Sequence, residues 1–65
     1  MAKNTYTYQW FEDARDLYMI IFLKDGQRIA GSIILEVEEG KPIYLLDADD
    51  TPNQFIPSEV VSVEY

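Results

Sequence analysis

Short runs of apolar residues, separated by polar turns, dominate the chain and predict β-strands over most of its length. The longest run covers residues 17–23, with Lys24 at its end, and is apolar at both alternating sets of positions, so a strand buried on both faces is expected over 17–24. Asp25-Gly26 follows directly and favours a two-residue hairpin of type I′, a turn that needs positive φ at both central positions. The returning strand is expected over residues 28–38, with Gly31 inside it as the site of a bulge or sharp bend.

The second half of the chain continues as short strands. They are expected at residues 43–46, 54–56 and 60–65, after polar connections at 39–41 and 47–53. Pro57-Ser58-Glu59 predicts a single 3₁₀ turn before the last strand, with Ser58 as its cap. In the last strand, alternation is expected to place Val61 and Val63 together on one face.

The N-terminal residues show two different patterns. Residues 4–10 alternate strictly, with Tyr6, Tyr8 and Trp10 on one face, which is typical of an edge strand or an extended arm. Residues 11–16 favour a short helix or turn, since part of the apolar pattern there also fits a helical stripe.

These elements together describe a single domain over residues 1–65. Five short strands, a bent second strand and a 3₁₀ turn predict an all-β fold, a small and strongly bent five-stranded barrel with a short N-terminal helix. Two alternatives are weaker. A flat five-stranded sheet would leave one face too apolar, and an α+β domain would need a longer helix.

Composition and charge exclude several classes of protein. The chain has 65 residues, no cysteine, no histidine, and 12 acidic against 5 basic residues, for a net charge of -7. A chain of this size buries only about 60% of its unfolded surface, so dense packing or self-association must supply its stability. The absence of cysteine and histidine excludes a disulfide framework and the usual zinc sites. Scattered basic residues in an acidic chain argue against nucleic-acid backbones and anionic membranes as partners.

The chain is expected to be cytoplasmic, without a membrane segment. Its first ten residues carry no apolar run of the kind found in secretory signals. The longest apolar stretch, residues 17–23, is seven residues long, far below the roughly 20 that span a bilayer.

Acidic residues cluster between positions 36 and 50 without forming a recognisable metal site. A calcium-loop pattern that starts at Asp47 fails, because Pro52 and Ser58 stand where a Gly and a bidentate Glu are required. The serines have no histidine to activate them, and a barrel of this size has no room for a deep pocket within one chain. We therefore expect no metal, no cofactor and no enzymatic activity.

Two segments resemble a known family of small barrels. Residues 17–26, followed by 29–33, resemble the apolar strand, glycine turn and bent glycine-containing strand of the Sm-like (LSm) domain. Val37-Glu38 and residues 43–45 stand where that family has Val-Asp and Leu-x-Leu. The resemblance implies a five-stranded barrel, preceded by a short helix, that joins other copies into a ring.

The same resemblance implies an interface and a ligand surface. In Sm-like rings the fourth strand of one subunit pairs with the fifth of the next, which here implicates Gln54, Phe55, Ile56, Val61 and Val63. The residues near the family's RNA-facing surface would be Glu38, Lys41, Asp47 and Ser58. Pro42 stands at or near the family's RNA-contacting Asn and the net charge is negative, so RNA binding is left open. In these respects the chain is more similar to acidic members from bacterial viruses.

The resulting hypothesis is a non-catalytic, homo-oligomeric binding or scaffold protein. Its ligand would be a protein, a small molecule held between subunits, or weakly bound RNA. The alternative is a monomeric adaptor, because residues 55–61 are similar to the Ile-Pro-Ser-x-Tyr-Val segment of Src-homology (SH3-like) peptide-binding barrels. Pro57 matches that segment and Val60 replaces its Tyr. This second resemblance implies peptide capture, for which the aromatic N-terminal residues offer a surface.

Overall fold

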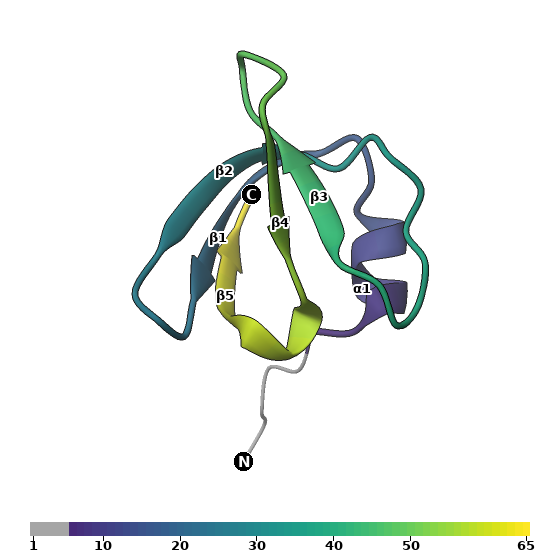
Figure 1. The fold of residues 1–65 in the computed structure, drawn as a ribbon, viewed down its shortest axis with the longest axis vertical. Coiled ribbons are helices and arrows are strands. Elements are labelled where there is room, and N and C mark those ends of the chain that lie inside the picture. Colours follow the sequence, from purple (N-terminus) through teal and green to yellow (C-terminus); the bar gives the residue numbers. More distant parts are fainter. Residues whose placement is uncertain (1–5) are drawn as a thin grey trace.

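The structure, a computed structural model, describes residues 6–65 and consists of one antiparallel sheet with a short helix beside it (Figure 1). The elements are α1 (Tyr8–Asp13), β1 (Tyr18–Leu23), β2 (Arg28–Ser32), β3 (Ile43–Leu46), β4 (Pro52–Phe55), the 3₁₀ turn η1 (Pro57–Glu59) and β5 (Val60–Glu64). The strand order is β4-β3-β2-β1-β5, so every neighbouring pair but the last is consecutive in the chain. This confirms the predicted all-β fold of five strands with a short helix. Among residues 6–65, no helix is long and apolar enough to cross a membrane.

Helix α1 begins where the alternating pattern predicted a strand, so that prediction is wrong for residues 8–10; residues 4–5 lie outside the described part. Thr7 is the N-cap, and its hydroxyl accepts a hydrogen bond from the Trp10 amide at 3.1 Å. This bond satisfies one of the amides that every helix start leaves without a partner. Phe11 then points into the core with no exposed surface, which fixes the helix against the sheet.

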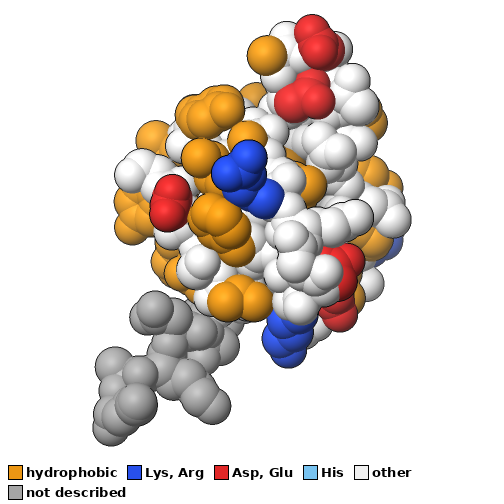
Figure 2. Space-filling model, turned by 90° about the vertical axis from the view of Figure 1, so that its left-hand side faces the viewer, with side chains coloured by type: hydrophobic (Ala, Val, Ile, Leu, Met, Phe, Trp, Pro, Cys, Tyr) orange, Lys and Arg blue, Asp and Glu red, His pale blue; other side chains and the backbone are white. Residues whose placement is uncertain are grey.

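Strand β1 is buried on one face only, against the expectation of two. Met19 and Ile21 have no exposed surface, whereas Ile20 and Phe22 are half-buried and Tyr18 is 64% exposed. Figure 2 shows hydrophobic side chains gathered over the β1–β2 side of the sheet. A continuous apolar run does not by itself show whether the outer face of a strand is buried or exposed.

The β1–β2 hairpin lies where Asp25-Gly26 predicted it, but its turn type differs. Of its loop residues only Gly26 has a positive φ, at +92°, whereas a type I′ turn needs two. The Gly26 amide donates to the Leu23 carbonyl at 3.0 Å, and the Leu23 amide donates to the Gln27 carbonyl at 2.9 Å. The connection is therefore a three-residue loop that ends on a left-handed glycine.

Gly31 produces the predicted bend, and β2 ends one residue later instead of continuing to residue 38. Its φ is +153°, and a Cβ at this position would collide with the carbonyl group of Leu46. Ser32 pairs with Leu46, and this is the one Cα pair that joins β2 to β3. The chain then leaves the sheet as a long connection over residues 33–42, anchored by the fully buried Ile33.

The core lies between the inner face of the sheet and α1. Its members are apolar and at most 8% exposed: Phe11, Ala14, Met19, Ile21, Ile33, Ile43, Leu45, Phe55 and Val60. Phe11 and Phe55 meet edge-to-face with ring centroids 5.0 Å apart, which joins the helix to β4.

The last strand departs from simple alternation. Val60 pairs with Leu23 and Ser62 with Phe22, which leaves Val61 as the extra residue of a bulge. Val63 pairs with the buried Ile21 and lies half-buried on the inner side, whereas Val61 is 54% exposed, so the two do not share a face as predicted.

The 3₁₀ turn is present at the predicted residues, but Ser58 does not cap it. Its N-cap is Ile56, which makes no side-chain capping bond. A backbone bond from the Lys24 amide to the Glu59 carbonyl, at 2.9 Å, ties the turn to the β1–β2 hairpin.

The contact between Gly31 and Leu46 leads to the first prediction. Gly31→Ala is expected to lower the free energy of unfolding by roughly 2–4 kcal/mol, because it adds both a left-handed strain and a collision with main-chain atoms. Gly26→Ala is the control, since its Cβ would meet nothing within 4 Å and only the strain applies, about 1 kcal/mol. Urea unfolding of both variants measures the difference, and equal losses would contradict the role given to Gly31.

Candidate functional site

The two edges of the sheet are β4 and β5. Strand β4 pairs only with β3, and β5 pairs only with β1, so each has one side without a strand partner among residues 6–65. Such an edge presents backbone donors and acceptors to any further strand. The two edges converge at η1, which joins β4 to β5 in the chain (Figure 1).

The five residues implicated in an interface divide into two groups. Gln54, Ile56 and Val61 are exposed on or beside the edge strands, with Ile56 38% and Val61 54% exposed. Phe55 is 5% exposed and belongs to the core, and Val63 faces inward beside Ile21. Only the first group is available for contact with another molecule.

A groove of about 760 Å³ lies on the described surface beside α1. The start of α1 forms one wall, the 33–42 connection forms another, and the beginning of η1 forms the third. Its apolar lining comes from Tyr6, Tyr8, Val37, Ile56 and Pro57. The volume falls within the range of roughly 300–1,000 Å³ that is usual for ligand sites.

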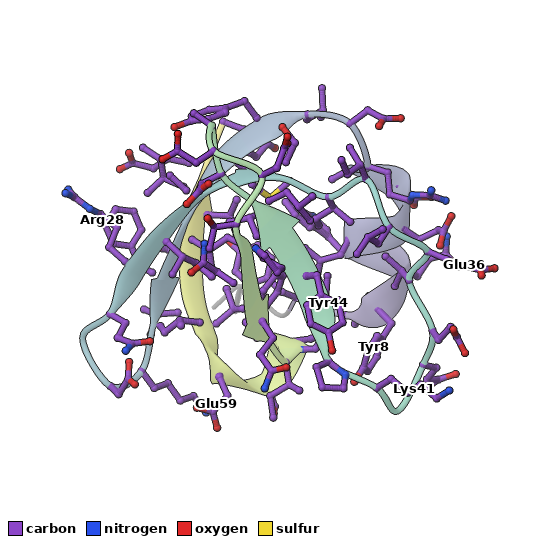
Figure 3. The ribbon with its side chains drawn as sticks, turned by 45° about the horizontal axis from the view of Figure 1, so that its top comes forward. Tyr8, Arg28, Glu36, Lys41, Tyr44 and Glu59 are labelled. Atoms are coloured by element: carbon purple, nitrogen blue, oxygen red, sulfur yellow. The ribbon has the colours of Figure 1, made fainter. Side chains whose placement is uncertain are left out.

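The charged groups that line the groove are both acidic. Glu12 and Glu39 line it, and Glu12 is also paired with Arg15 at 3.4 Å. Figure 3 shows Tyr8 and Lys41 on the helix side of the molecule, whereas Arg28 projects from β2 on the opposite side. The lining itself therefore favours a ligand that carries positive charge, since the Lys41 ammonium beside it is already paired with Glu38.

Three of the four predicted ligand residues lie at or beside this groove. Ser58 lines it directly. Glu38 and Lys41 flank the lining residues Glu39 and Gly40 and pair with each other at 3.3 Å, both with exposed side chains. The Lys41 ammonium therefore already has a carboxylate partner, although an exposed pair of this kind is weak and exchangeable.

Asp47 lies elsewhere, in the β3–β4 hairpin loop that projects from the barrel (Figure 1). Its Oδ1 accepts hydrogen bonds from the amides of Asp49 at 2.8 Å and Thr51 at 3.0 Å. Its own amide donates to the Thr51 carbonyl at 3.2 Å. The carboxylate therefore closes a loop, the usual role of Asp in a turn, and does not join the groove.

The acidic residues do not assemble into a metal site in the part of the chain that the structure describes. No group of three Asp or Glu side chains among residues 6–65 is placed to hold a metal ion.

The groove could not be predicted from the alternating pattern, because that pattern places Tyr6 and Tyr8 on a strand. The available signal was Thr7 itself, a residue type that favours the N-cap, and its hydroxyl does accept from the Trp10 amide. Val37 was assigned to a long second strand, whereas it lies in the connection that forms the groove wall.

Comparison of the chain with family models, with curated proteins and with solved structures finds no match.

The hydrogen bonds of Asp47 lead to a second prediction. Asp47→Ala is expected to lower the free energy of unfolding by about 1 kcal/mol, because two loop amides lose their acceptor. Asp49→Ala is the matched control, since the Asp49 side chain forms no hydrogen bond within residues 6–65 and its loss should change stability by less than about 0.5 kcal/mol. Urea unfolding at neutral pH compares them. A harmless Asp47→Ala would mean that this carboxylate is free for another role.

Proposed function

We propose that this protein is a non-catalytic scaffold that assembles with copies of itself through the edges of its sheet. β4 of one copy pairs with β5 of the next, as the resemblance to Sm-like domains implies. The observation that supports this proposal is the strand order, which leaves β4 and β5 as the two edges.

The geometry of such a contact favours a closed assembly. A contact between two different edges is heterologous, so repeated copies form a ring when the rotation closes and a filament when it does not. A ring removes both edges, which in a small sheet would otherwise invite uncontrolled pairing. Ile56 and Val61 add exposed apolar side chains on or beside these edges.

The partner of the assembly is, in this proposal, a protein or a small molecule and not RNA. The chain carries a net charge of -7. Two of its basic side chains, Arg15 and Lys41, are already paired with Glu12 and Glu38. Phosphate contacts require clustered and available cations.

Val61→Glu tests the assembly. A carboxylate at this exposed edge position is expected to convert the oligomer into a folded monomer, because the charge would be buried against the neighbouring strand without a partner. Leu35→Glu is the matched control, since Leu35 is 48% exposed and lies outside both edge strands. Size-exclusion chromatography with light scattering gives the mass of each. An unchanged oligomer in Val61→Glu would exclude this interface, and a monomeric wild-type chain would exclude assembly.

The groove supports a second candidate function, the capture of an extended peptide by a single chain. Its aromatic and proline lining suits an extended, proline-containing segment, and Glu12 and Glu39 favour basic residues in that segment.

Ser58→Phe tests this second candidate. The larger side chain would fill the groove from an exposed position that makes no capping bond. Isothermal titration calorimetry is carried out with a panel of basic proline-rich peptides. The peptides are expected to bind the wild-type chain and Val61→Glu, but not Ser58→Phe. Equal binding by all three proteins, or binding by none, would contradict the groove as the peptide site.

A further inference from the structure

A second hollow lies at the far end of α1, beside the residue that follows β5. It has a volume of about 290 Å³ and is lined by Trp10, Asp13, Ala14, Leu17 and Tyr65. Trp10 and Asp13 belong to α1, and Tyr65 comes directly after the last strand. We call this hollow the Trp10–Tyr65 corner.

Two aromatic rings form its walls. The Trp10 and Tyr65 centroids lie 5.9 Å apart and their planes meet at 66°, so the edge of one ring meets the other instead of stacking on it. Tyr65 is 82% exposed, although it lies next to a half-buried Trp10. Both rings therefore contribute surface to the same open corner.

The Trp10 ring also packs against two other aromatic rings. Tyr6 packs edge-on against it with centroids 5.0 Å apart, and Phe11 does so at the same separation. Phe11 is itself fully buried in the core. One wall of the corner is thus fixed before any ligand arrives, which lowers the entropy cost of binding.

The remaining lining sets the chemistry of the occupant. Ala14 and Leu17 are apolar, and Asp13 supplies a carboxylate. The Gln9 amide nitrogen donates to Oδ1 of Asp13 at 2.9 Å, which orients this group. Within residues 6–65, Asp13 forms no ion pair, unlike Glu12 and Glu38.

Two aromatic rings, a carboxylate and apolar side chains together complement a cation with an apolar surface. A cation near an aromatic face is attracted by the negative charge of the ring system. A quaternary ammonium group is weakly hydrated and donates no hydrogen bonds, so it loses less on entering an apolar corner than a primary ammonium does. The net charge of -7 attracts any such cation at long range.

We propose that the Trp10–Tyr65 corner is a binding site for a quaternary ammonium group. The group enters against the two rings and beside the Asp13 carboxylate, and the rest of its ligand stays outside, because the hollow is open and small. The same chemistry is carried by choline-type small molecules and by trimethylated lysine side chains.

Trp10 is the single tryptophan of the chain, so its fluorescence reports on this site directly. The full chain is titrated at constant ionic strength with choline chloride and with Nα-acetyl-Nε-trimethyl-lysine methylamide. The neutral isostere of choline, 3,3-dimethylbutan-1-ol, is titrated in parallel. We expect saturable quenching by both cations and about tenfold weaker binding, or none, for the isostere. Tighter binding of one cation identifies which of the two sources the corner prefers.

Substitutions inside and outside the corner distinguish a cation site from a general apolar patch. Tyr65→Leu keeps an apolar side chain but removes one aromatic face, and Asp13→Asn keeps an acceptor for Gln9 but removes the charge. Each is expected to weaken choline binding about threefold to fivefold. Tyr18→Leu removes another exposed tyrosine, on β1 and outside the corner, and should bind as the wild type does. Val61→Glu should also bind normally, so a failure of the proposed assembly would not be mistaken for a failure of this site.

The indole N–H resonance of Trp10 in a ¹H–¹⁵N spectrum is the second readout. A shift with choline, reduced in Asp13→Asn, supports the site even if the fluorescence changes little. Equal binding of the neutral isostere, equal binding by Asp13→Asn, or no response in either readout would overturn the proposal.

Discussion

The close approach of Gly31 to the carbonyl group of Leu46 is the constraint on which the rest of the structure depends. It lets β2 bend at the point where it pairs with β3 through Ser32. The bend lets the sheet curve around Phe11, Ile21 and other apolar residues, while β4 and β5 remain its two edges. It also ends β2 early, and this releases the connection that forms one wall of the groove. One backbone contact therefore bears on both the core and the wall of the groove.

Much of this architecture can be predicted from the chain itself. Turn residues are informative because the backbone conformations that they favour depend on the residue itself. Gly31 correctly predicted the bend, and Pro57 correctly predicted the 3₁₀ turn at its observed bounds. The start of α1 was predicted wrongly, because alternation over 4–10 competes with a cap at Thr7 and with the burial of Phe11. Burial of Phe11 depends on the position of β4, which no local pattern contains.

The candidate site was less predictable than the fold, for a physical reason. A groove is made by segments that are distant in the chain, here the start of α1, the 33–42 connection and η1. Ser58 was identified through a resemblance and does line the groove, whereas Asp47 closes its own loop through two amides. An acidic side chain in a turn has the same local sequence whether it binds a ligand or a backbone amide.

The sheet edges, the groove and the Trp10–Tyr65 corner share one origin. A core of nine largely buried apolar residues cannot cover every hydrophobic side chain of so small a chain, and the remainder lies exposed, as at Val61 and Tyr65. Assembly through β4 and β5 would cover part of this exposed surface, and native mass spectrometry of the unaltered protein measures it. A closed ring predicts one discrete multiple of the chain mass. A bare monomer at micromolar concentration and low ionic strength would contradict it.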